Sequence, residues 1–175
     1  MSHCIFPGSF DPPTRGHMDL ICRAARLFDQ VTVAVMVNRA KAGSIPWEAR
    51  VSMLQKACRD LPNVRVELWK GLLADYVRMQ GTEAVVLRGI RNGMECEQEL
   101  VSAGVNRLLC PGMETILMPA ADGLAQVSSS AVREIASFGG DYGFLVPEEI
   151  KEDIDTFLYR GIRQDEMTPS EAGNR

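Results

Sequence analysis

Phe-Pro-Gly-Ser-Phe-Asp-Pro-Pro-Thr-Arg-Gly-His-Met-Asp-Leu, residues 6–20, joins a predicted strand to a predicted helix. The apolar run Cys4–Phe6 ends at a Pro-Gly pair, Asp11–Pro13 favours a turn, and an amphipathic segment begins near Gly16. The first N–H groups of a helix lack partners and carry the positive end of its dipole, which favours an anion. Gly16 permits close approach of a ligand, and His17 adds an imidazole donor. The stretch therefore predicts a phosphate-binding turn.

Four further apolar runs alternate with segments of helical spacing, which predicts a parallel sheet covered by helices. The predicted strands are Cys4–Phe6, Val31–Val37, Val64–Leu68, Ala84–Leu87 and Thr115–Met118. The predicted helices span about 16–29, 46–60, 72–80, 94–109, 129–138 and 147–159. The fold class is therefore α/β: a single Rossmann-like, doubly wound domain with a five-stranded parallel sheet. Ligands of such sheets bind beyond the carboxyl ends of the strands.

Two of these helices carry apolar stripes that should face the sheet. In the first, Met18, Ile21, Ala25 and Phe28 follow helical spacing. In the fourth, the expected inward residues are Leu100, Ala103 and Leu108. Both stripes predict helices packed on a sheet face.

The composition is that of one globular domain, with 46% hydrophobic and 24% charged residues in 175. We expect a domain over residues 1–160 and a polar, disordered tail over 161–175.

The net charge of −4 argues against general nucleic-acid binding, so an anionic substrate needs locally gathered cations. The five cysteines are scattered and there are two histidines, which disfavours a structural zinc site. With no signal peptide or bilayer-length apolar stretch, we expect a cytoplasmic protein with no membrane partner.

A second cluster of candidate residues, Arg88-Gly89-Ile90-Arg91, directly follows the strand Ala84–Leu87. Two guanidinium forks at the end of a buried strand suit phosphate oxygens. The alternative is a pair of surface arginines neutralised by nearby glutamates. Glu95 and Glu99 lie one helical turn apart, a like-charge spacing that calls for cationic partners. For Glu95 itself, a solvated helix face is the preferred interpretation.

Two more segments could complete an anion site. Lys41 lies in the loop 38–44, where a mobile cation could close over an anion, although most loop lysines have no specific role. Ser128–Ser130 open a predicted helix, so hydroxyls and unpaired N–H groups gather there. Taken alone, a serine N-cap explains this second segment.

The motifs together resemble those of the nucleotidyltransferase superfamily. Gly8-Ser9-Phe10-Asp11-Pro12 followed by Thr14-Arg15-Gly16-His17 is similar to its (His or Thr)-x-Gly-His signature, and Val127–Ser130 resembles its Ile-Ser-Ser-(Ser or Thr) motif. The Thr form and the Arg-Gly-Ile-Arg segment resemble the bacterial-type pantetheine-phosphate adenylyltransferases. The resemblance spans roughly residues 4–159.

The resemblance implies adenylyl transfer from ATP to 4′-phosphopantetheine by direct in-line attack, with Mg²⁺ bound mainly through ATP phosphates and no protein metal ligands. It also implies a homohexamer. The implied catalytic residues are His17, Lys41 and Arg91. The implied ATP contacts are Ser9, Phe10, His17, Gly89, Ile90, Arg91, Glu99, Leu124, Ala125, Gln126, Val127, Ser128, Ser129 and Ser130. The implied acceptor contacts are Ser9, Lys41, Leu73 and Arg88.

Two other functions remain open from sequence. One is nucleotidyl transfer to nicotinamide mononucleotide or to a sugar or alcohol phosphate, which Thr14 and the Arg88–Arg91 segment disfavour. The other is a non-catalytic nucleotide-binding module, because a fold alone does not imply an activity. The sequence also departs from the family at Cys96 and Gln98, where many members have aromatics, and at Leu124, where tryptophan is frequent.

Overall fold

The structure is a computed structural model that describes residues 1–37, 43–81 and 84–159. Lys41 and the predicted tail 161–175 lie outside these residues. The strands are β1 (His3–Gly8), β2 (Gln30–Met36), β3 (Val64–Trp69), β4 (Val85–Ile90) and β5 (Glu114–Pro119). The helices are α1 (Arg15–Leu27), α2 (Trp47–Ala57), α3 (Leu73–Gln80), α4 (Gly93–Leu109), α5 (Ser129–Ser137) and α6 (Glu148–Leu158), with a short 3₁₀ helix, η1 (Gly143–Leu145).

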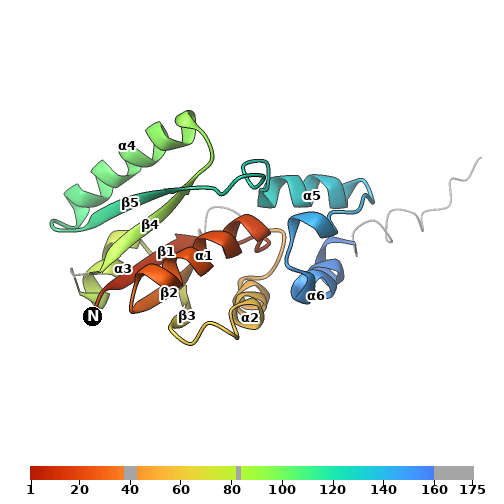
Figure 1. The fold of residues 1–175 in the computed structure, drawn as a ribbon, viewed down its shortest axis with the longest axis horizontal. Helices are drawn as coiled ribbons and strands as arrows, with labels where there is room; N and C mark the ends of the chain where they lie inside the picture. Colours follow the sequence, from red (N-terminus) through yellow and green to blue (C-terminus); the bar gives the residue numbers. More distant parts are fainter. Residues whose placement is uncertain (38–42, 82–83, 160–175) are drawn as a thin grey trace, which may run out of the picture.

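The five strands form one sheet in the order β3-β2-β1-β4-β5, and every neighbouring pair is parallel (Figure 1). This confirms the predicted α/β fold with a five-stranded parallel sheet. The chain order reverses direction between β1 and β4, which is the switch point where doubly wound sheets bind ligands.

Alternate residues of β1 pack into two different cores, one on each face of the sheet. Cys4 and Phe6 face α1 and α2, where Ile21 and Leu54 belong to the same cluster. Ile5 lies in a separate cluster that holds Tyr76 and Val77 of α3. The sheet is thus covered on both sides at β1, which is why Cys4, Ile5 and Phe6 are apolar at every position and all buried.

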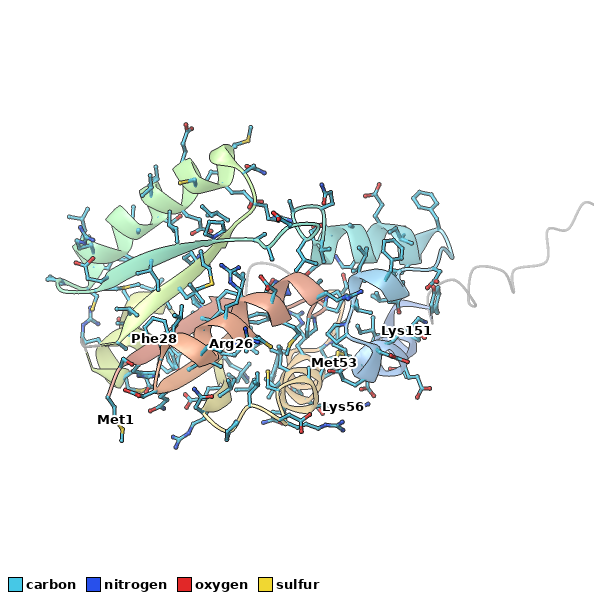
Figure 2. All side chains as sticks on the ribbon, viewed as in Figure 1. Met1, Arg26, Phe28, Met53, Lys56 and Lys151 are labelled. Carbon is cyan, nitrogen blue, oxygen red and sulfur yellow. The ribbon has the colours of Figure 1, made fainter. Side chains whose placement is uncertain are left out.

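The last two helices form a third core beyond the end of the sheet (Figure 1). Val132 of α5 and Ile150 of α6 are fully buried there, together with Met53 of α2. Figure 2 shows Met53 and Lys56 on α2 beside α6, and Lys56 Nζ lies 2.9 Å from the carboxylate of Asp153. Among the described residues, none of the helices has the length and apolar character needed to cross a bilayer.

The sheet opens between β1 and β4. Their pairing consists of Cys4 with Val85 and Ile5 with Val86, whereas β1 pairs with β2 along its whole length, from His3 to Gly8. Beyond Ile5 the two strands separate, and a crevice forms at their carboxyl ends. β4 also runs further than predicted, because its residues through Ile90 stay paired with β5. Arg88 therefore lies on the strand itself instead of after it.

The prediction that Leu100 and Leu108 of α4 point inward is wrong. Leu100 is 59% exposed and Leu108 is 84% exposed, and Ala103 is only half-buried. α4 contacts β4 and β5, yet it is the one helix among the described residues without a buried side chain. Helical periodicity identifies an apolar stripe but does not say what covers it, and here the stripe faces outward.

Candidate active site

A pocket of about 420 Å³ lies where β1 and β4 separate. Its walls come from the carboxyl ends of these strands, the first turn of α1, the first turns of α4, and the start of α5. Two helix N-termini, those of α1 and α5, therefore open onto one crevice. Their unpaired N–H groups favour an anionic ligand there.

Thr14 and His17 fix one another at the start of α1. The Thr14 side chain caps the helix by accepting the backbone N–H of His17, and the Thr14 backbone N–H donates to His17 Nδ1 at 3.0 Å. A backbone N–H can only donate, so Nδ1 acts as an acceptor and the neutral ring carries its hydrogen on Nε2. The capping box thus sets both the orientation and the tautomer of the imidazole.

His17 is held in its neutral form. Burial, together with a smaller contribution from the positive charge of Arg91, lowers the pKa of His17 to about 4. At neutral pH the ring is therefore an uncharged donor through Nε2. Such a group can stabilise negative charge that develops on a ligand by donating a hydrogen bond to it.

The ring of Phe10 packs against the imidazole of His17. Its ring lies 4.9 Å from the His17 ring in an edge-on arrangement and is 1% exposed. Phe10 has a φ of 47°, unusual for a residue with a side chain. A Cβ on Gly8 would lie 2.9 Å from the Phe10 ring, so this packing requires glycine at position 8. The turn is therefore shaped for close packing around His17.

Both predicted arginines reach the pocket, and each is paired with a glutamate of α4. Arg88 donates to Glu99 through Nε at 2.7 Å and Nη2 at 2.6 Å, and through Nη1 to the Pro7 carbonyl at 3.0 Å. Arg91 forms a similar pair with Glu95. The cationic partners expected for Glu95 and Glu99 are thus these arginines.

The start of α5 is tied to the turn at residues 9–13. Ser128 caps the helix by accepting the Ala131 N–H at 3.1 Å, and Ser129 Oγ donates to the Pro12 carbonyl at 2.8 Å. Arg133 donates to Ser130 Oγ at 3.2 Å and to the Asp11 carbonyl. Ser128 and Ser130 only accept in these contacts, so their O–H groups remain for a phosphate, together with the unpaired backbone N–H groups of the first turn of α5.

A buried ion pair holds the other side of the same turn. Arg50 and Asp11 are 7% and 8% exposed, and Arg50 Nε lies 3.4 Å from the Asp11 carboxylate. Arg50 also donates to the carbonyls of Ile45 at 2.7 Å and Ser9 at 3.1 Å. Asp11 accepts the N–H groups of Ser44 and Ile45, each at 2.9 Å. Every buried side-chain polar atom of this pair therefore has a hydrogen-bond partner.

Most of the predicted site residues line this one pocket. They are Ser9, Phe10, His17, Arg88, Gly89, Ile90, Arg91, Glu99, Leu124, Val127, Ser128, Ser129 and Ser130. Ala125 and Gln126 are exposed in the turn before α5, outside the lining. Leu73 begins α3 and packs against the core on the far face of the sheet. Lys41 lies outside the described residues.

Sequence reasoning missed two residues and misjudged a third. Arg133 lines the pocket, and its position one turn after Ser129 and Ser130 was an available signal. Arg50 lies beneath the site, and its burial depends on a distant partner that periodicity does not show. Glu95, assigned to a solvated face, lines the pocket instead.

Within the described ranges, no group of three or more His, Cys, Asp or Glu side chains is placed to hold a metal ion.

Comparison with known proteins identifies the family. A cytidylyltransferase-like family model matches residues 5–135. Phosphopantetheine adenylyltransferase from Finegoldia magna is 43% identical over 150 residues, which are 86% of this chain and 92% of that protein. The enzymes of the same name from Rubrobacter xylanophilus and Clostridium kluyveri are 46% and 41% identical, each over 154 residues, with 88% of this chain and 93% of theirs covered.

The fold also matches a solved structure. A Vibrio parahaemolyticus protein assigned as a nicotinate-nucleotide adenylyltransferase superposes with a TM-score of 0.63, covering 91% of this chain and 96% of that one. At 17% identity this likeness supports the fold alone. The sequence relatives are far more similar and share nearly their full length with this chain. The chain belongs to the phosphopantetheine adenylyltransferase family of the cytidylyltransferase-like nucleotidyltransferases.

Proposed function

We propose that this chain transfers the adenylyl group of ATP to 4′-phosphopantetheine, giving dephospho-coenzyme A and pyrophosphate. The chain belongs to a family whose members are named phosphopantetheine adenylyltransferase, which supports the proposal. The observation that carries it is His17, a neutral imidazole with a fixed tautomer in the first turn of α1, lining the same pocket as the start of α5. The structure offers the means to bind and stabilise phosphates, which is what phosphoryl-type transfers chiefly require.

The proposed reaction is a direct in-line displacement. The acceptor phosphate attacks the α-phosphorus of ATP, a P–O bond forms, and the bond to pyrophosphate breaks. His17 Nε2–H and the N-terminus of α1 stabilise the charge that develops on the α-phosphate. Arg91 and the first N–H groups of α5 hold the leaving pyrophosphate, while Lys41, Arg88 and Ser9 orient the acceptor phosphate.

Mg²⁺ in this proposal binds mainly through ATP phosphate oxygens. The pocket carboxylates nearest the arginines, Glu95 and Glu99, are already engaged by Arg91 and Arg88. Mg²⁺ usually keeps several waters and takes phosphate oxygens with few protein ligands, which fits this donor set. When bound, the ion would neutralise triphosphate charge.

A pyrophosphate-release assay with a panel of substrates tests the function. ATP with 4′-phosphopantetheine should give release well above that with nicotinamide mononucleotide or glycerol phosphate, and CTP should be a poor donor. Preference for one of the other acceptors would assign the chain to a different nucleotidyl transfer. Nucleotide binding with no release for any acceptor would instead favour a non-catalytic module.

Lys41→Ala should impair use of the acceptor and leave ATP use unchanged. Loss of one charged hydrogen-bond donor should reduce kcat/KM for 4′-phosphopantetheine by roughly 10- to 100-fold. Steady-state kinetics with each substrate varied in turn measures this. Lys56→Ala is the control, because Lys56 pairs with Asp153 at the junction of α2 and α6. A defect confined to ATP would contradict the assignment.

We also propose that the protein is a homohexamer, as the family resemblance implies, with α4 in the contact between copies. The exposed apolar side chains of α4 support this: Met94, Leu100, Val101, Val105 and Leu108. Val101→Glu combined with Leu108→Glu should reduce the mass measured by light scattering. Leu27→Glu, which changes an exposed residue of α1, should not. An unchanged mass for the double variant would exclude α4 from the contact.

We propose a cytoplasmic location and a single domain over residues 1–160. All five cysteines are free, as expected for a protein kept in a reducing compartment. The buried thiols of Cys4 and Cys58 also have pKa values raised to about 12 by burial, which disfavours the reactive thiolate. These cysteines therefore act as small core residues.

A further inference from the structure

Glu99 and Glu95 form ion pairs of the same geometry with the two pocket arginines, Arg88 and Arg91, respectively. Glu99 accepts Nε and Nη2 of Arg88, and Glu95 accepts Nε of Arg91 at 3.1 Å and also Nη2. In each pair the two oxygens of one carboxylate meet the same edge of the guanidinium. Such bidentate pairs fix orientation as well as adding energy. Two successive turns of α4 thus determine where both guanidinium planes lie.

The two arginines differ in their remaining donors. A guanidinium has five N–H donors, and Nη1 carries two of them. Arg88 directs Nη1 to the Pro7 carbonyl at 3.0 Å. For Arg91 the described residues supply no acceptor to Nη1, and Arg91 lines the pocket. Arg91 therefore keeps an unused edge for a ligand, on the side away from Glu95.

Glu95 is itself held in place before any ligand arrives. Its backbone N–H donates to Oδ1 of Asn92, the N-cap of α4, at 2.9 Å. Its carboxylate also accepts the backbone N–H of Arg91 at 2.8 Å. The hydrogen bonds from Arg91 lower the pKa of Glu95, so it is ionised at neutral pH. A charged, anchored carboxylate can restrict an arginine side chain that is otherwise 36% exposed.

We propose that Glu95 is a positioning residue for ATP, which holds the Nε edge of Arg91 so that its Nη1 edge meets the triphosphate. The inference deepens the proposed function and rests on it. Glu95 touches no substrate in this account and acts only through Arg91. Because the pair uses one edge of the guanidinium, a phosphate can bind the other edge while the pair stays intact.

Glu95→Gln tests the proposal, since it removes the charge but keeps the size and an acceptor for the Arg91 N–H. Calorimetry with Mg²⁺ and a non-hydrolysable ATP analogue should show about tenfold weaker binding. In turnover, KM for ATP should rise by a similar factor, with KM for 4′-phosphopantetheine unchanged. Glu97→Gln is the matched control: it makes the same chemical change on the same helix, at an exposed residue without an ion pair in the described part of the chain.

A double-mutant cycle with Arg91→Ala separates positioning from a general effect on the helix. In the Arg91→Ala background, Glu95→Gln should cause no further loss of analogue affinity. A further tenfold loss there would overturn the proposal. So would a Glu95→Gln protein that binds the analogue as well as the parent, and tighter binding would show that Glu95 competes with the triphosphate. Failure of the parent protein to use 4′-phosphopantetheine would refute the proposed function, while analogue binding still tests Glu95.

Discussion

Replacing His17 with alanine should lower turnover by about 10²–10³-fold, the loss found when one oxyanion donor is removed. The reason is the fixed Nε2–H, which alanine lacks. Pyrophosphate release at saturating ATP and acceptor measures the effect. Affinity for an ATP analogue should change much less, because the donor matters most for charge that develops during the reaction. Near-normal turnover would refute the role given to His17.

The pH profile provides a second check on His17. Because its pKa is lowered to about 4, the ring stays neutral from pH 6 to 9. A plot of the parent protein's activity against pH should therefore show no step near pH 6.5 that is due to His17. Such a step would be present in the parent and absent from His17→Ala. A step of that kind would indicate an ordinary histidine acting in acid–base transfer. His17→Gln is a useful companion variant, since its amide N–H₂ restores a donor without a titratable ring.

Replacing Arg50 with methionine should reduce the free energy of unfolding by roughly 3–5 kcal/mol, as is typical when one member of a buried ion pair is removed. The Asp11 carboxylate would stay buried with two backbone N–H partners but no counter-charge. Urea unfolding, followed at equal protein concentrations, measures the change.

Lys56→Met is the matched control for Arg50→Met. Both residues lie on α2 and form an ion pair, but Lys56 and Asp153 are 44% and 43% exposed. An exposed pair contributes about 0–1 kcal/mol, so this variant should unfold close to the parent. Equal effects of the two substitutions would mean that burial of the Asp11–Arg50 pair has no special importance.

The fold and the core of the site could be predicted because they depend on local patterns. Apolar β-branched runs mark buried strands, and a motif after each strand must reach the same sheet edge. The exposure of Leu100 and Leu108 was missed because a stripe is the same whether it faces the core or a partner. Arg50 was missed because Asp11 and the Ser9 carbonyl are brought near it only by the tertiary fold. Arg133 was missed although Ser130, one turn earlier, gave a local signal; its other partner, the Asp11 carbonyl, is brought near only by the fold.

Glu95 illustrates a different limit. From sequence, two glutamates one turn apart on a helix are equally consistent with a solvated face and with paired arginines. Which of the two holds depends on β4 extending to Ile90, because this keeps Arg88 on the strand and places Arg91 directly after it. Strand ends are among the least certain features of a sequence pattern, and here the length of one strand decides the role of a helix residue.

The turn after β1 is held by side chains that lie outside it. The carbonyls of Pro7, at the end of β1, and of Ser9, Asp11 and Pro12, in the turn itself, accept hydrogen bonds from Arg88, Arg50, Arg133 and Ser129, respectively. These hydrogen bonds are made to main-chain oxygen atoms, so most of them do not depend on which side chains the turn itself carries. Transplanting residues 7–17 alone onto another α/β scaffold would therefore bring the signature without its shape. An engineer would need to move the four supporting side chains as well.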